Sequence, residues 1–166
     1  KLEYPLNMSS VNYATGRLQY LYDTWLKNTD CKVYAAMIPD KGYFLAQSNG
    51  YPAMDYEALS ESYRNTLTWA THTDLTDLLS AEDYYRTDTH WRQERILDVA
   101  QRLCETMEAA VPKVEDYTQE KVNVPFYGVY FGQAALPMEP EVLYVPKSDV
   151  LDSCTVTDPI TGKTSA

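Results

Sequence analysis

The residues of this chain best suited to chemistry are Asp88 and His90, which are separated by one residue. In an extended segment, residues i and i+2 point to the same side, so this carboxylate and this imidazole can meet. A carboxylate that accepts one ring N–H orients the histidine and stabilises its protonated form. The second ring nitrogen is then free to take a proton. The pair therefore predicts the base half of a hydrolase or acyltransferase site.

The nucleophile that such a base would activate is not evident in the 166 residues. The sequence contains no G-x-S-x-G motif. Asp152 and Ser153 form an Asp-Ser pair, but no glycine-rich turn accompanies them, so we interpret them as ordinary strand residues. Ser165 has no surrounding motif. We expect either a serine beyond Ala166, with this chain a fragment that stops within a fold, or an inactive protein.

A simpler interpretation of the same residues stays open. Asp88 or Thr89 could be the N-cap of a helix that begins at about Trp91, because short polar side chains satisfy the free N–H groups of a helix start. His90 would then be a partly buried residue in the first turn. Two-residue motifs also arise often by chance.

Neither a metal site nor a cofactor is predicted. A zinc site from His72, His90 and Asp74 has no recognised ligand spacing, and a lone strand histidine is usually a hydrogen-bonded structural residue. The cysteines form no C-x-x-C pair, which excludes a cysteine-rich zinc site and a dense disulfide framework. One bridge with one free thiol is possible, but three buried thiols are simpler, at Cys31, Cys104 and Cys154.

Composition describes an ordinary globular chain. Hydrophobic residues make up 45% and charged residues 23%, and 166 residues suffice for one domain with a hydrophobic core. The net charge of −10 argues against nucleic acid, because phosphate binding requires a basic patch, and against an anionic membrane surface. No apolar run approaches the roughly 18 residues of a membrane span, and the first residues do not resemble a signal peptide. The 15 tyrosines suit half-buried faces and sugar-binding grooves.

Hydrophobic periodicity predicts alternating helices and strands as the scaffold for the Asp88–His90 pair. Ser9 or Ser10 is the expected cap of the first helix, and Pro112 is expected to end the last one. Such alternation indicates an α/β layer around a largely parallel sheet. The predicted order is a helix at 10–28, a buried strand at 32–39, a helix at 55–67, a strand at 68–73, a short helix or turn at 75–80, and a helix at 91–111.

The pattern changes after residue 111. Residues 122–135, 141–146 and 151–157 have the composition of strands or extended segments, and 158–162 that of a turn. We interpret residues 121–166 as a β-rich excursion within one truncated domain that spans 1–166.

Three further residues are candidates for substrate binding. Lys41 follows an expected strand end, where α/β folds place ligand sites, although an exposed loop lysine is the default. Arg86 could bind a carboxylate or phosphate, or pair with Asp83 or Glu82. Trp91 could stack on a sugar ring, or anchor the following helix in the core.

Residues 84–91, followed by a long helix, resemble the Asp-x-His-Trp signature of the alginate O-acetyltransferase family and the related DHHW proteins, a permuted branch of SGNH hydrolase-like enzymes. The run at 32–41, which ends in proline, aspartate and lysine, is similar to the family's first core strand. Residues 74–79 are similar to the segment that leads to the motif. The resemblance covers about residues 32–111. The chain departs from DHHW proteins at Thr89, where they usually have a second histidine, although the acetyltransferase branch tolerates threonine.

The resemblance implies an SGNH-like α/β domain in an extracytoplasmic bacterial protein that moves acetyl groups on cell-surface polysaccharide, with a carbohydrate or acyl donor as substrate and no cofactor. Carried over, Asp88 orients His90, His90 is the general base, and the serine follows them in sequence. Two alternatives stay open. One is an inactive carbohydrate- or envelope-binding protein on the same scaffold, and the other is an esterase that uses water as acceptor.

Overall fold

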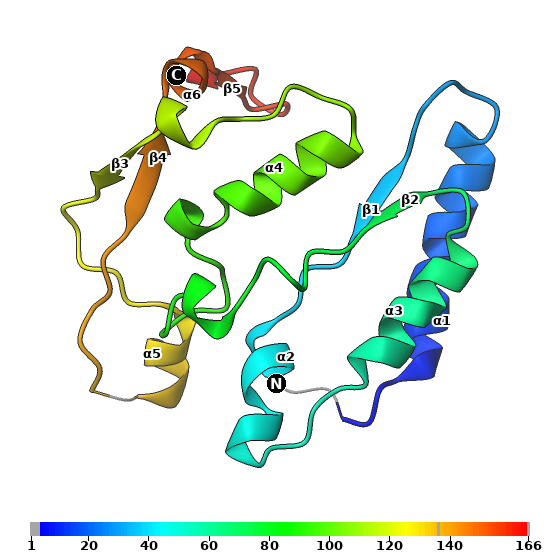
Figure 1. Ribbon diagram of the computed structural model, residues 1–166, viewed down its shortest axis with the longest axis horizontal. Coiled ribbons are helices and arrows are strands. Elements are labelled where there is room, and N and C mark those ends of the chain that lie inside the picture. The colour runs from blue at the N-terminus through cyan, green and yellow to red at the C-terminus, as the bar shows by residue number, and fades with distance from the viewer. Residues whose placement is uncertain (1–3, 136, 166) are drawn as a thin grey trace. The chain divides into compact units, whose positions relative to one another are not determined.

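The computed structural model describes residues 4–135 and 137–165 and divides into two compact units, Lys1–Ala81 and Glu82–Ala166 (Figure 1). The prediction that residues 1–166 form one domain stays a prediction. Among the residues described, no helix is both long and apolar enough to cross a bilayer.

The first unit combines helices with a short parallel ladder. Strand β1 pairs in parallel with β2, with Ala35 opposite His72, as the intervening helical crossover requires. Helices α1 and α3 pack against each other and lie side by side in Figure 1. The elements are α1 (Met8–Leu21), the π-helical turn η1 (Tyr22–Leu26), β1 (Tyr34–Ala36), α2 (Lys41–Leu45), η2 (Gln47–Asn49), α3 (Tyr56–Thr66) and β2 (Thr71–Thr73).

Local sequence accounts for the helix starts of this unit. The Asp55 carboxylate accepts the N–H of Ala58 at 2.9 Å, so α3 begins where the periodicity predicts. The cap of α1 is Asn7, whose side chain accepts the N–H of Ser10, and the expectation of Ser9 or Ser10 was wrong by two or more positions. The core side chains are Val11, Ala46, Leu67, Leu75 and Leu79.

The sheet differs from the predicted one. The strand expected at 32–39 is confined to Tyr34–Ala36 and is half-buried to exposed rather than buried. Among the described residues, β1 has a neighbouring strand, β2, on one edge alone. The described strands form three two-stranded sheets, one parallel and two antiparallel, rather than a largely parallel sheet.

The second unit packs short helices with two antiparallel ladders. Strand β3 pairs with β4, and β5 with β6, while isolated bridges join Tyr84 to Trp91 and Phe126 to Glu141. The elements are η3 (Ala81–Asp83), which begins at the boundary, η4 (Gln93–Arg95), α4 (Leu97–Thr106), η5 (Val114–Asp116), β3 (Thr118–Lys121), α5 (Val129–Ala134), β4 (Tyr144–Lys147), α6 (Asp149–Ser153), β5 (Val156–Thr157) and β6 (Thr164–Ser165).

The helix expected at 91–111 is shorter, and Asp88 and Thr89 do not cap it. Trp91 lies in the bridge to Tyr84, and the helix α4 starts only at Leu97. It ends at Thr106, before Pro112, because Glu108 takes a left-handed conformation with φ of 56°. The capping interpretation of Asp88 is therefore wrong.

Two segments expected to be extended contain helices. Residues 122–135 include α5, whose first N–H groups are bound by side chains and backbone of a distant loop. Residues 151–157 begin inside α6, where the Ser148 hydroxyl accepts the N–H of Leu151 as an N-cap. The turn predicted at 158–162 is confirmed, with Gly162 at φ of 68°. The cysteines are free, but Cys31 and Cys154 are exposed and Cys104 is half-buried, so the expectation of three buried thiols was wrong.

Candidate active site

The candidate site is a loop of the second unit that folds back on itself between Asp83 and Arg92. The Arg92 N–H donates to the Asp83 carbonyl at 2.7 Å, and the Tyr85 N–H donates to the His90 carbonyl at 3.1 Å. Tyr84 and Tyr85 are both buried, and they anchor the base of the loop in the core. The tip of the loop is therefore held on a fixed base.

Asp88 and His90 meet at the tip. The Asp88 Oδ1 atom lies 2.5 Å from His90 Nδ1 and also accepts the His90 backbone N–H at 3.0 Å. Because an ionised carboxylate can only accept, Nδ1 carries the shared proton, and Nε2 of the neutral ring has a free lone pair. The Asp88 side chain is 6% exposed and that of His90 is 78% exposed. The acid is thus enclosed while the imidazole faces solvent.

The surroundings keep Asp88 ionised. Burial by itself raises the pKa of this carboxyl group, but hydrogen bonds from the Val129 N–H and from the backbone and ring of His90 outweigh it. Together they lower the pKa of Asp88 to about 2. The carboxylate can therefore orient and stabilise an imidazolium without taking its proton.

The start of α5 supplies part of that environment. The Val129 N–H donates to Asp88 Oδ2 at 2.9 Å, the Gly128 N–H donates to the Thr87 hydroxyl at 3.1 Å, and the Tyr130 N–H donates to the Thr87 carbonyl at 2.9 Å. These are N–H groups that a helix start leaves without a partner in the helix. Residues 41 positions away in sequence thus complete the hydrogen bonding of Asp88.

Gly128 is required by its position rather than by its backbone angles. Its φ of −71° is open to any residue. A Cβ atom built there would lie 2.5 Å from the Asp88 Cβ and would also collide with the Thr87 carbonyl group. Only glycine lets α5 approach the loop this closely.

Glu141 holds the other side of the loop. Its Oε1 accepts the Arg86 N–H at 2.7 Å, and its Oε2 accepts the Thr87 N–H at 2.6 Å and the Thr87 hydroxyl at 2.5 Å. Burial by itself raises the pKa of Glu141. These hydrogen bonds and the charge of Arg86 lower the pKa by more than burial raises it, so the net shift is downward. Thr87 is completely buried.

Sequence reasoning did not identify Thr87, Gly128 or Glu141. Glu141 is one acidic residue among 24, and nothing near it in the sequence distinguishes it. Gly128 offered a weak signal, because a glycine inside a run of aromatic and β-branched residues often marks a close backbone approach.

The three residues predicted to bind substrate are distributed over both units. Arg86 is exposed, and its guanidinium donates to the Glu139 carbonyl at 3.4 Å. Trp91 is half-buried next to His90, and Lys41 is the first residue of α2 in the first unit. Their roles stay predictions.

The other chemical candidates have structural partners. His72 Nε2 lies 2.9 Å from the Leu67 carbonyl, as expected of a structural histidine. Ser153 lies in α6, not in a strand, and its hydroxyl donates to the Val150 carbonyl at 2.7 Å. In residues 4–135 and 137–165, no three His, Cys, Asp or Glu side chains are grouped to hold a metal ion, and no hydrogen bond reaches His90 Nε2.

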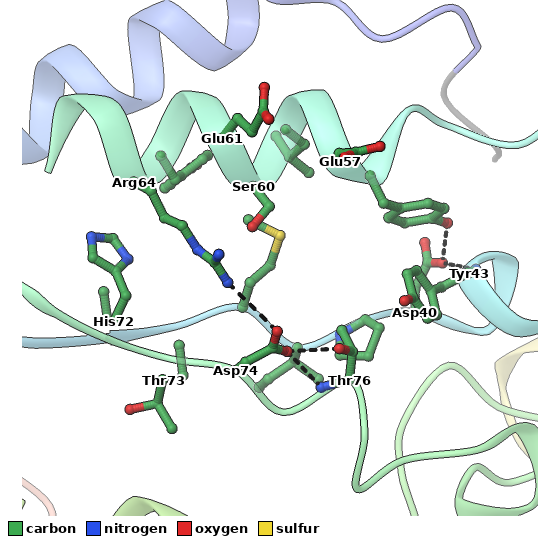
Figure 2. Close-up of a pocket in the computed structure, with 18 of the residues that line it drawn as sticks. Asp40, Tyr43, Glu57, Ser60, Glu61, Arg64, His72, Thr73, Asp74 and Thr76 are labelled. Carbon is green, nitrogen blue, oxygen red and sulfur yellow. Dashed lines mark hydrogen bonds and ion pairs between the residues drawn. The ribbon is translucent and has the colours of Figure 1, made fainter. Parts of the chain in front are cut away.

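A pocket of about 740 Å³ lies in the first unit between α3 and the carboxyl ends of β1 and β2. Figure 2 shows Arg64 of α3 reaching across it to Asp74, with an N–O distance of 3.5 Å. At its other end the Tyr56 hydroxyl donates to Asp40 at 2.6 Å. Burial first, then this hydrogen bond and the Asp40 charge, raise the pKa of Tyr56. The pocket's remaining lining mixes apolar side chains with polar ones such as Ser60, Glu61 and His72.

Comparison with solved structures identifies the fold. A DHHW family protein from Eubacterium siraeum superposes with a TM-score of 0.64 at 19% identity, covering 89% of this chain and 58% of that one. The O-acetyltransferase domain of Pseudomonas putida AlgJ has a TM-score of 0.62 at 17% identity, covering 86% and 58%. Bacillus cereus PatB1 with a sulfonyl adduct has a TM-score of 0.66 at 15% identity, covering 99% and 58%.

These similarities confirm the resemblance to DHHW and O-acetyltransferase proteins at the level of the fold. The chain spans 58% of the length of each of these solved structures. No protein-family model and no curated protein sequence matches it.

Proposed function

We propose that this chain carries the base half of an acyltransferase site that moves acetyl groups on cell-surface carbohydrate. The observation that carries the proposal is the contact between the buried Asp88 carboxylate and Nδ1 of an exposed His90. An imidazole held in this way has an Nε2 atom that can accept a proton from solvent-accessible reactants. The nucleophile in this proposal is a serine supplied from outside the 166 residues.

The proposed reaction has two steps. In the first, the serine Oγ attacks the acetyl carbonyl of the donor, its proton passes to His90 Nε2, and the leaving donor oxygen takes that proton. In the second, a sugar hydroxyl gives its proton to Nε2 and attacks the acetyl-serine, and the serine oxygen leaves with the proton. Asp88 stabilises the imidazolium in each step, and backbone N–H groups hold the developing oxyanion.

The comparisons support this class of reaction. One structure with the same fold is the O-acetyltransferase domain of AlgJ, and another, PatB1, carries a sulfonyl adduct. By the same analogy we place the protein outside the cytoplasm of a bacterium. Arg86 and Trp91, which flank the pair in sequence, are our candidates for contacts to the substrate.

Labelling of the natural full-length protein with a serine-reactive fluorophosphonate tests the proposal. We expect labelling of the wild-type protein and loss of labelling in His90→Ala, because the serine then has no base. His72→Ala is the matched control, since it removes the other histidine, which is bound to a backbone carbonyl. Unchanged labelling in His90→Ala would contradict the role of His90.

One observation also fits a second candidate function. Within the described part of the chain, His90 Nε2 has no hydroxyl partner. A carbohydrate-binding protein that retained the scaffold without a nucleophile would show this arrangement too. Absence of labelling in the wild-type protein, together with binding of acetylated polysaccharide, would support the binding function over the enzyme.

A further inference from the structure

We infer that Glu141 and Thr87 are positioning residues that hold the Asp88–His90 pair in its working geometry through a directed chain of hydrogen bonds. The inference rests on the proposed function, because the geometry matters for catalysis only if His90 acts as a base. Neither residue touches the imidazole. Both would act through Asp88.

The first step in the chain is the link between Glu141 and Thr87. The Glu141 carboxylate accepts three hydrogen bonds from two consecutive residues, Arg86 and Thr87, at 2.5 to 2.7 Å. Its sequence distance from them is 54 to 55 residues, so the contact is tertiary. Hydrogen bonds from three donors are strongest when the carboxylate that accepts them is ionised. The negative charge of Glu141 therefore strengthens the contact between its segment and the loop.

The second step is the direction of the Thr87 hydroxyl. Its oxygen accepts the N–H of Gly128 at 3.1 Å and lies 2.5 Å from Glu141 Oε2. A backbone N–H can only donate and a carboxylate can only accept, so the single hydroxyl proton must point to Glu141. The hydroxyl oxygen then presents its lone pairs to Gly128. Because Thr87 is completely buried, no water competes for these positions.

The third step connects this relay to Asp88. Gly128 and Val129 are consecutive, and the N–H of Val129 donates to Asp88 Oδ2 at 2.9 Å. With Oδ2 held there, the Oδ1 atom is directed to His90 Nδ1 at 2.5 Å. A change at Glu141 is therefore transmitted through Thr87 and Gly128 to the orientation of the Asp88 carboxylate, and from there to the imidazole.

The variants follow from this chain. Thr87→Val removes the hydroxyl at nearly constant shape, and Thr87→Ser retains the hydroxyl. Glu141→Gln replaces one carboxylate oxygen with an NH2 group, which then faces a donor of Arg86 or Thr87 and cannot accept its hydrogen bond. Glu139→Gln is the matched control, because the exposed Glu139 contributes only its backbone carbonyl to the loop.

The first measurement is the tautomer of His90, by ¹H–¹⁵N NMR of the full-length protein at about pH 9, where imidazoles are neutral. The chain has two histidines, and His72 serves as an internal reference. We expect the Nδ1–H tautomer of His90 in the wild type, Thr87→Ser and Glu139→Gln. In Thr87→Val and Glu141→Gln we expect a shift of His90 toward the Nε2–H tautomer, with His72 unchanged. A merely structural role would leave the tautomer of the folded variants unchanged, and that result would overturn the inference.

The second measurement is the hydrolysis of p-nitrophenyl acetate. We expect Thr87→Val and Glu141→Gln to lower kcat by about 10- to 100-fold with little change in KM, as misplacement of a catalytic group does. Thr87→Ser should recover most of the activity. If the tautomer shifts but the wild type has no activity that depends on His90, the proposed function fails and the positioning stands. If His90 is essential but the two variants keep both tautomer and kcat, the positioning fails and the function stands.

Discussion

Substitution of Gly128 by alanine tests the close approach of α5 to the Asp88 loop. The added Cβ would lie 2.5 Å from the Asp88 Cβ and would collide with the Thr87 carbonyl group. These are backbone and Cβ atoms rather than the ends of flexible side chains, so α5 or the loop must move. Such overpacking typically costs about 1–3 kcal/mol.

The movement would also remove hydrogen bonds. The N–H groups of Gly128 and Val129 donate to Thr87 and to the Asp88 carboxylate, and a hydrogen bond to a charged group contributes about 1.5–3 kcal/mol. We therefore expect Gly128→Ala to lower the free energy of unfolding by about 3–5 kcal/mol. The pKa of Asp88 should rise from about 2 toward its ordinary value, because it loses its Val129 donor.

Gly132→Ala is the control, because Gly132 lies in the same helix and a Cβ there meets nothing within 4 Å. Alanine is favoured over glycine in a helix by about 0.8–1.0 kcal/mol, so this variant should be slightly stabilised. Urea unfolding monitored by circular dichroism measures both variants, and ¹³C NMR of the Asp88 carboxyl gives its pKa. If Gly128→Ala unfolds at the same urea concentration as Gly132→Ala, with the pKa of Asp88 still near 2, our account of this contact is refuted.

Three other outcomes follow from the structure. The folded-state pKa of Asp88 is about 2, below its ordinary value, so its ionised form stabilises the folded state by about 2 kcal/mol above about pH 4. This stabilisation is lost as the pH falls through about 2. Asp88→Asn should therefore flatten this part of the plot of unfolding free energy against pH. Asp55→Ala removes the N-cap of α3 and should cost about 1 kcal/mol in thermal unfolding, and no change in melting temperature would argue against the cap. Iodoacetamide should modify Cys31 and Cys154 of the folded protein faster than Cys104, as followed by peptide mass spectrometry, whereas equal rates would contradict their different exposure.

The successes of the sequence analysis are local in origin. The helix at 55–67 was found because its cap and its apolar spacing lie within one segment, and the turn at 158–162 because Asp158 and Gly162 supply its hydrogen bonds and its positive φ. The parallel pairing of β1 with β2 agrees with the alternation of helices and strands in this part of the sequence.

The failures occurred where distant residues overrode local preference. Residues 122–135 are rich in β-forming side chains, yet α5 forms there because its first N–H groups bind Thr87 and Asp88. Trp91 has helical neighbours in the sequence, but its bridge to Tyr84 delays the helix until Leu97. Neither contact leaves a trace in the periodicity of its own segment.

The meeting of Asp88 with His90 was accessible from the sequence, since residues two positions apart in an extended loop necessarily share a side. The burial of the carboxylate, the extent to which its pKa is lowered and the orientation of its Oδ2 atom were not accessible, since they depend in part on Val129, 41 residues away. Short-range geometry is set by bond lengths and allowed backbone angles, which the order of residues encodes directly. The electrostatic environment depends on which surfaces the folded chain brings together, and only the tertiary structure determines that.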